Sequence, residues 1–125
     1  MKTALECWGN WGDYIHSFNR KKPALSSETI ALRKHLLNKA KLAATLLREQ
    51  YNIKRLTIVG SLAHQAWFHP DSDVDLAVEG LDTKAFWDAW KLVEDIIETH
   101  DVDLIDLDSI PEARKNEIMR YGIEL

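Results

Sequence analysis

Two aspartates separated by a single residue, Asp73 and Asp75, are the side chains of this sequence best placed to do chemistry. They lie in an apolar run that predicts a β-strand. Successive side chains of a strand alternate between its two faces, so both carboxylates project from one face. Two carboxylates side by side repel each other unless positive charge lies between them. Mg²⁺ prefers hard oxygen ligands and is often held by one or two carboxylates together with substrate phosphates. The spacing therefore predicts a divalent-cation site.

Gly60 and Ser61, upstream of the aspartates, predict a phosphate-binding turn. They follow the apolar run 55–59, and Gly60, which has no Cβ, permits a sharp turn and close approach of a ligand to the backbone. The Ser61 hydroxyl adds a hydrogen-bond donor. We expect residues 62–67 to begin a helix whose free backbone N–H groups and positive dipole end face the same space. A phosphate-binding turn and a metal-binding pair in one strand-turn-strand unit indicate chemistry on a nucleoside triphosphate.

A third carboxylate is expected from the acidic strand at residues 101–107. A carboxylate in the middle of a hydrophobic strand is costly to bury unless something compensates for it. If this strand lies beside the one that carries the aspartate pair, Asp103 completes a three-carboxylate site. The strand is not cleanly amphipathic, so the residues alone leave Asp101 and Asp106 open as alternatives to Asp103.

Helices and strands alternate along the chain around these residues. Apolar residues recur at helical spacing in the longer segments, and Ser, Asp, Asn and Gly stand where caps and turns are needed. The expected elements are a helix from Ser26 or Ser27 to Tyr51 or Asn52, a strand at 55–59, a strand at 73–79 ended by Gly80, a helix capped by Asp82 and running to about Thr99, a strand at 101–107, and a helix capped by Asp108 and Ser109 that begins near Pro111 and ends at Gly122. This order predicts an α/β (α+β) fold in which a small mixed β-sheet is flanked by helices.

The length of 125 residues suits one domain. We assign residues 26–125 to this domain and residues 1–25 to an aromatic-rich N-terminal arm. The arm either packs on the domain's own core or contacts a partner, because aromatic side chains are favoured in both places. No further domain that could bind an acceptor is expected, so an acceptor would have to bring its own docking surface.

The charge balance and the apolar segments limit the function classes. With 16 Lys and Arg against 20 Asp and Glu, the formal net charge is −4, so no direct DNA binding is expected. No apolar segment approaches membrane-spanning length, and no signal-peptide core follows Met1. The single cysteine, Cys7, cannot form an internal disulfide. These features predict a cytoplasmic protein with no membrane association.

The Gly-Ser turn, the Asp-x-Asp pair and the later strand residue Asp103, taken in this order, resemble the motif of the minimal nucleotidyltransferases (MNT). These belong to the DNA polymerase β-type nucleotidyltransferase superfamily, and the resemblance is to the antitoxin-like MNT proteins encoded beside HEPN-domain toxins. It extends from about Ser26 to Leu107, with PDSDVDLAV and VDLIDLD the most similar stretches. The chain departs from the family pattern after the Gly-Ser turn, where Leu62 and His64 stand among positions that carry a glycine and basic residues in many members.

The resemblance implies a nucleotidyltransferase-like fold and transfer of AMP from ATP onto a hydroxyl with release of pyrophosphate. It implies that Gly60 and Ser61 hold the triphosphate. It also implies that Asp73, Asp75 and Asp103 bind Mg²⁺, with two ions expected, and that Asp103 activates the acceptor hydroxyl. The implied acceptor is a tyrosine of a HEPN toxin whose RNase activity is silenced by AMPylation. The chain would then be the antitoxin of a type VII toxin–antitoxin system.

Two other interpretations stay open at this point. The nucleotidyltransferase could act on a small-molecule or RNA hydroxyl instead of a protein. Alternatively, the chain could be a binding-only antitoxin with a vestigial site that covers its toxin through the aromatic arm and Trp87. His64 and His69 have poor spacing for metal ligands and are expected to be polar surface. The nucleotide preference and the oligomeric state, homo-oligomer or hetero-oligomer, also stay open.

Overall fold

Helix α3 (Ser27–Tyr51) is the longest element of the structure, a computed structural model that describes residues 26–125. Its ends are those expected from the sequence. The Ser26 side chain accepts a hydrogen bond from a first-turn backbone N–H at 3.1 Å, and Asn52 ends the helix in the left-handed conformation with φ 53°. The predicted arm at residues 1–25 lies outside the described residues.

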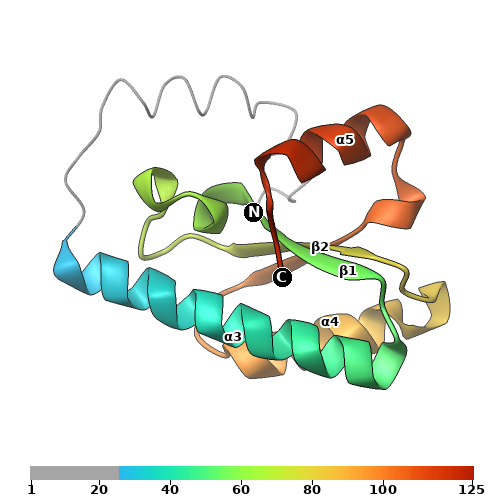
Figure 1. Cartoon of the computed structure of the whole chain (residues 1–125). Helices are drawn as coiled ribbons and strands as arrows, with labels where there is room; N and C mark the ends of the chain where they lie inside the picture. Colours follow the sequence, from blue (N-terminus) through green and yellow to red (C-terminus); the bar gives the residue numbers. More distant parts are fainter. Residues whose placement is uncertain (1–25) are drawn as a thin grey trace.

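Four strands form one mixed sheet in the order β3-β2-β1-β4. The strands are β1 (Arg55–Val59), β2 (Val74–Glu79), β3 (Val102–Asp106) and β4 (Ile123–Glu124). β1 runs antiparallel to both β2 and β4, whereas β2 and β3 are parallel. The end of β1 and the beginnings of β2 and β3 therefore meet at the same end of the sheet (Figure 1).

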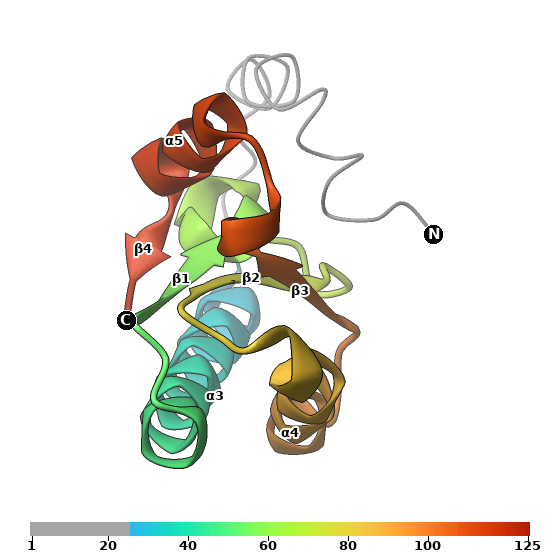
Figure 2. The ribbon, with the colours of Figure 1, turned by 90° about the vertical axis from the view of Figure 1, so that its right-hand side faces the viewer.

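Helices cover both faces of the sheet (Figure 2). α4 (Phe86–Ile97) connects β2 to β3 and lies with α3 on one face, while α5 (Glu112–Tyr121) lies over the other. Each face has its own hydrophobic cluster. The cluster on the α3 and α4 side includes Leu36, Leu47, Leu56, Ile58, Leu76, Val93 and Ile97, and the cluster on the α5 side includes Val59, Trp67, Ala77, Ile105, Leu107 and Ile118. The predicted α/β fold with a small mixed sheet flanked by helices is confirmed. None of the helices within residues 26–125 is long and apolar enough to cross a membrane.

The segment that follows β1 differs from the helix expected over residues 62–67. Two short 3₁₀ turns, η1 (Gly60–Ala63) and η2 (Gln65–Trp67), take its place, and His64 separates them with extended backbone at φ −132° and ψ 118°. A helix of six residues is marginal by itself. The segment bends because its apolar side chains divide between the two hydrophobic clusters.

The C-terminal segment also differs from the prediction. Asp108 and Ser109 do not cap α5, whose N-cap is Pro111 without a side-chain hydrogen bond. Instead, Asp108 accepts a hydrogen bond from the Gly80 N–H at 2.8 Å, and Ser109 donates its hydroxyl to Asp106 at 2.8 Å. β4 was not predicted, because a strand of two residues is defined by its pairing with β1 and not by a sequence pattern.

Candidate active site

Asp75 lies directly opposite Asp103 in the parallel register of β2 and β3. Both side chains project to the α5 side of the sheet, because Ala77 and Ile105, two residues further along each strand, pack in the hydrophobic cluster on that side. Neighbouring strands are about 4.8 Å apart, so the two carboxylates are close neighbours. Asp73 immediately precedes β2 at the same end of the sheet. The structure thus places at one end of the sheet the three acids that the sequence singles out.

The other two acids of the third strand take different positions. Asp106 lies opposite Val78, three residues further along β3, where its side chain caps the 3₁₀ turn η4 (Leu107–Ser109). Asp101 precedes β3, is exposed, and lies close enough to Asp73 to raise the pKa of that carboxyl. Of the three candidates, Asp103 is therefore the one that lies opposite Asp75 within the paired strands.

The turn at Gly60 packs directly against Asp75. Gly60 has a left-handed backbone with φ +70°, and a Cβ at this position would lie 2.4 Å from Asp75 Oδ2. No other residue tolerates both conditions. Ser61 follows in η1 and is half-buried. Because η1 has four residues, any phosphate contact here would use individual N–H groups and the Ser61 hydroxyl instead of the dipole of a full helix.

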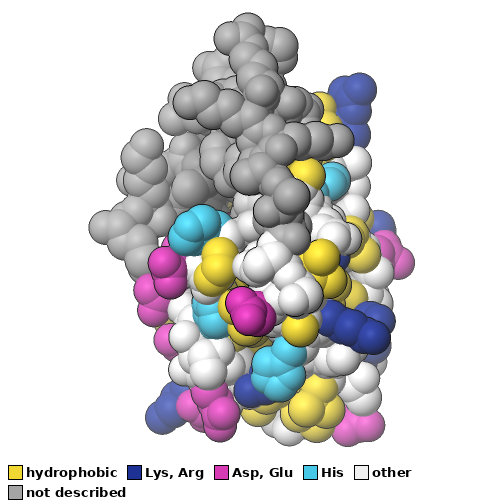
Figure 3. Space-filling model, turned by 90° about the vertical axis from the view of Figure 1, so that its left-hand side faces the viewer, with side chains coloured by type: hydrophobic (Ala, Val, Ile, Leu, Met, Phe, Trp, Pro, Cys, Tyr) yellow, Lys and Arg dark blue, Asp and Glu magenta, His cyan; other side chains and the backbone are white. Residues whose placement is uncertain are grey.

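The carboxylates at this end of the sheet carry unfavourable charge in the protein alone. Burial, followed by the charges of Asp103 and Asp73, raises the pKa of Asp75 to about 8. Burial and the charge of Asp101 also raise the pKa of Asp73, while His100 acts in the opposite direction. Figure 3 looks onto this end of the molecule, on which Asp, Glu and His side chains, and also Lys and Arg side chains, lie among hydrophobic ones.

The chemistry of these carboxylates suits a divalent cation. The donors are hard oxygens, and the raised pKa of Asp75 means that the site favours added positive charge, either a proton or a metal ion. Within residues 26–125, no three Asp, Glu, His or Cys side chains already converge as a complete metal-binding cluster. The assignment of Asp73, Asp75 and Asp103 as metal ligands therefore stays a prediction that rests on their chemistry and their position.

His100 is a neighbour of the site that the sequence did not reveal. Its Nε2 lies 2.8 Å from the Pro70 carbonyl oxygen, and its Nδ1 lies 2.7 Å from the Thr99 hydroxyl. The Asp101 carbonyl accepts a hydrogen bond from the Val74 N–H at 2.8 Å, which ties the segment before β3 to the start of β2. Only the strand register, which was not visible in the sequence, could have shown this proximity.

Arg33 of α3 contacts the segment that follows the Gly-Ser turn. Its Nε donates a hydrogen bond to the Leu62 carbonyl oxygen in η1 at 3.1 Å, and burial lowers the pKa of the guanidinium. The contact joins α3 to the turn that carries Ser61. Arg33 thus brings a cation to the segment in which the expected basic residues are absent from the sequence.

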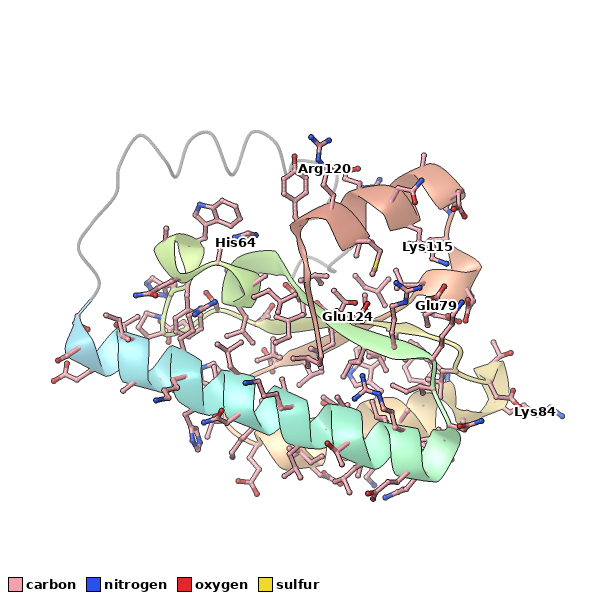
Figure 4. The ribbon with its side chains drawn as sticks, in the orientation of Figure 1. His64, Glu79, Lys84, Lys115, Arg120 and Glu124 are labelled. Carbon is pink, nitrogen blue, oxygen red and sulfur yellow. The ribbon has the colours of Figure 1, made fainter. Side chains whose placement is uncertain are left out.

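The two histidines near the Gly-Ser turn have structural roles. His64 is half-buried beside Trp67, with ring centroids 3.9 Å apart, and its Nε2 lies 2.9 Å from the Tyr121 carbonyl oxygen at the end of α5 (Figure 4). Burial is the main cause that lowers the pKa of His64. His69 is exposed, and its Nδ1 accepts a hydrogen bond from the Asp71 N–H at 3.1 Å.

The chain belongs to the nucleotidyltransferase family of polymerase beta. Residues 40–125, which include the strands and all three site carboxylates, match the family described as Polymerase beta, Nucleotidyltransferase. The fold is accordingly a polymerase-beta nucleotidyltransferase fold. No curated protein sequence matches the chain significantly.

Solved toxin–antitoxin structures resemble the chain more specifically. The crystal structure of a toxin–antitoxin with AMP-PNP shares 28% sequence identity with it at a TM-score of 0.57, over 70% of this chain and 71% of that one. The toxin–antitoxin MntA–HepT shares 26% identity at a TM-score of 0.51, over 70% and 68% of the two chains. A variant of that complex with two Asp-to-Glu changes gives 26% identity and a TM-score of 0.55, over 69% and 70%. The chain is thus similar to a minimal nucleotidyltransferase antitoxin.

Proposed function

We propose that this chain is an Mg²⁺-dependent nucleotidyltransferase that transfers AMP from ATP to a tyrosine hydroxyl of a HEPN-domain toxin. In this role it is the antitoxin of a type VII toxin–antitoxin system. The observation that carries the proposal is the pairing of Asp75 with Asp103 beside the Gly60 turn, in a chain of the nucleotidyltransferase family. The similarity to MntA–HepT and to the toxin–antitoxin with AMP-PNP supports the kind of partner and the nucleotide.

The proposed roles follow from the positions of the side chains. Gly60 and Ser61 hold the triphosphate through backbone N–H groups and the hydroxyl. Asp73, Asp75 and Asp103 hold Mg²⁺, with two ions expected. When bound, Mg²⁺ neutralises charge on the phosphate oxygens and stabilises the entering and leaving oxygens. Nucleotidyl transfer depends on positioning and charge neutralisation more than on covalent chemistry by the protein, and ligands on two paired strands give a rigid position.

In the proposed reaction, one P–O bond forms, one P–O bond breaks and one proton is transferred. The acceptor hydroxyl oxygen forms a bond to the α-phosphorus of ATP, and the bond from this phosphorus to the oxygen that bridges to the β-phosphate breaks. Pyrophosphate leaves on the side of Gly60 and Ser61. The hydroxyl proton passes to the carboxylate of Asp103. Asp103 works as a base through its position, since a nearby cation keeps it ionised.

Incubation with ATP labelled at the α-phosphate, Mg²⁺ and the purified product of the adjacent HEPN-type gene tests this function. We expect label on the partner, and its loss in the double variant Asp73→Asn, Asp75→Asn. Asp71→Asn is the matched control, because the Asp71 side chain is 93% exposed in the same loop. Label on an RNA or a small molecule without any protein partner would replace the acceptor. Absence of label with a folded protein would contradict the proposal.

A binding-only antitoxin is the second candidate, and the exposure of Trp87 favours it. This ring is 72% exposed, as expected of a residue that a partner covers. The same double variant separates the two functions, because binding needs no metal ligands. Neutralisation that survives the Asp73→Asn, Asp75→Asn change but is lost on removal of residues 1–20 would assign the effect to binding.

A further inference from the structure

A groove lies between α4 and the outer edge of β3, the strand at the end of the sheet. Its volume is about 340 Å³, and its lining consists of Trp87, Trp90, Glu94, Asp101, Val102 and Asp103. Asp103 lies on the edge strand that lines the groove, while its carboxylate projects to the α5 side of the sheet with the candidate active site. Asp101 adds a second link, because its carbonyl oxygen accepts a hydrogen bond at 2.8 Å from the N–H of Val74, the residue after Asp73. A molecule in this groove would reach the site carboxylates by passing around the outer edge of β3.

The tryptophans of the groove form an aromatic platform that is fixed from below. Trp90 is half-buried and donates its indole N–H to the Val102 carbonyl oxygen at 3.0 Å, which fixes the ring against the edge of the sheet. Trp87 stacks on Trp90 with centroids 5.4 Å apart and an interplanar angle of 12°. Trp87 nevertheless stays 72% exposed. A large ring held in one orientation and left in water is typical of a binding surface.

The polar lining of the groove has one sign of charge. Its ionisable side chains are Glu94, Asp101 and Asp103, and the described lining includes no Lys, Arg or His. Indole faces attract cations, and carboxylates form charge-assisted hydrogen bonds with guanidinium and ammonium groups. The combination favours arginine or lysine side chains and disfavours a triphosphate.

The position of the groove also places it on the side of the sheet at which the acceptor would enter, opposite the leaving pyrophosphate. In an in-line displacement the entering oxygen approaches the phosphorus from the side opposite the leaving group. Gly60, which we assign to the triphosphate, follows β1, and Asp103 lies on β3, with β2 and Asp75 between them. A leaving pyrophosphate on the β1 side places the acceptor on the β3 side, where the groove opens.

We propose that this groove binds a basic segment of the acceptor polypeptide, with arginine or lysine side chains on the Trp87 and Trp90 platform and against Glu94 and Asp101. The segment brings its hydroxyl to Asp103. The inference rests on the proposed function for the acceptor role, but not for the binding itself.

Fluorescence anisotropy of labelled peptides on the full-length protein tests the binding. One peptide has a tyrosine flanked by arginines, and the other has glutamates in place of the arginines. We expect the basic peptide to bind about tenfold more tightly or better, and Trp87→Ala or Glu94→Lys to reduce its affinity roughly fivefold to tenfold. Leu42→Ala, at another exposed hydrophobic residue, and Asp95→Lys, at an exposed acid beside Glu94, are matched controls that should leave the affinity unchanged.

Two further measurements separate failure of this inference from failure of the proposed function. Equal binding of the two peptides would overturn the docking site. Weaker ATP binding by Trp87→Ala with unchanged peptide binding would also overturn it and would assign the groove to a nucleobase. The same peptide preference in the inactive double variant Asp73→Asn, Asp75→Asn is expected, because the groove residues remain. If that preference holds while the wild-type protein labels no acceptor, the groove stands and the transfer reaction does not.

Discussion

Gly60 packs so closely against Asp75 that adding a methyl group at this position should affect both the stability of the fold and the candidate active site. Gly60→Ala would introduce strain at φ +70° and place the Cβ 2.4 Å from Asp75 Oδ2. We expect a loss of about 1–3 kcal/mol in the free energy of unfolding together with loss of nucleotidyl transfer. Gly80→Ala is the matched control, since Gly80 also has a positive φ, +83°, with the Lys54 backbone 2.7 Å from a Cβ. Denaturation and transfer assays of both variants check this: the control should lose stability but keep nucleotidyl transfer.

The ionised carboxylate of Asp75 is expected to reduce the stability of the metal-free protein. Its pKa is raised from 3.8 to about 8, so the folded state binds the proton more tightly than the unfolded state does. Its contribution to stability is therefore complete below pH 4 and is lost as the pH rises towards 8. Asp75→Asn should stabilise the metal-free protein at pH 8 by roughly 2 kcal/mol. This is less than the full pKa difference implies, because the carboxylate keeps some contact with water.

Thermal unfolding between pH 4 and pH 8 measures this effect. The difference in Tm between Asp75→Asn and the wild-type protein should grow with pH and disappear near pH 4. Mg²⁺ should raise the Tm of the wild-type protein at pH 8 but have little effect on the variant, because a ligand stabilises only the state that binds it. A wild-type protein more stable than the variant at pH 8 without metal would contradict the raised pKa.

At the scale of elements, α3 supports the phosphate-binding turn through one contact. Arg33 donates to the Leu62 carbonyl oxygen in η1, one residue after Ser61. Arg33→Ala should loosen this turn and weaken ATP binding about fivefold, the effect expected from loss of one hydrogen bond to a charged group. Lys34→Ala is the control, because Lys34 is exposed on the same helix. Isothermal titration with ATP and Mg²⁺ measures both, and equal affinities would assign Arg33 to structure alone.

The elements with strong local signals could be predicted from the sequence, and those defined by tertiary contacts could not. The caps at Ser26 and Asn52 and the strand β1 were predicted correctly, because each depends on a local backbone preference. The pairing of Asp75 with Asp103 could only be offered as a condition, since a register shift of one residue would turn a side chain to the other face. The bend at His64 escaped prediction because burial on two sides of the sheet produces it.

Across the whole molecule, acids at the two ends of the sheet have opposite environments. At the site end, neighbouring carboxylates raise the pKa values of Asp73 and Asp75. At the other end, Glu79 is 4% exposed, its carboxylate pairs with Arg55 at 2.6 Å, and it accepts a hydrogen bond from Lys115 of α5. That hydrogen bond is the main cause that lowers the pKa of Glu79. One end is therefore expected to bind a cation, while the other holds α5 on the sheet.

The ion pairs of Glu79 should determine how the stability of the fold changes at acidic pH. Because the pKa of Glu79 is lowered in the folded state, its contribution is present above its ordinary pKa of 4.5 and is lost as the pH falls through the folded value. Lys115→Met removes the main partner of Glu79, so it should lower the Tm at pH 7. The Tm difference from the wild-type protein should be smaller at low pH, where Glu79 is protonated in both proteins.

Lys84→Met, at an exposed lysine for which no ion pair within the described residues is found, is the control and should have little effect. Thermal unfolding from pH 3 to pH 7 measures this. A Tm difference that does not change with pH would mean that Lys115 contributes through packing of its aliphatic chain instead of through its charge.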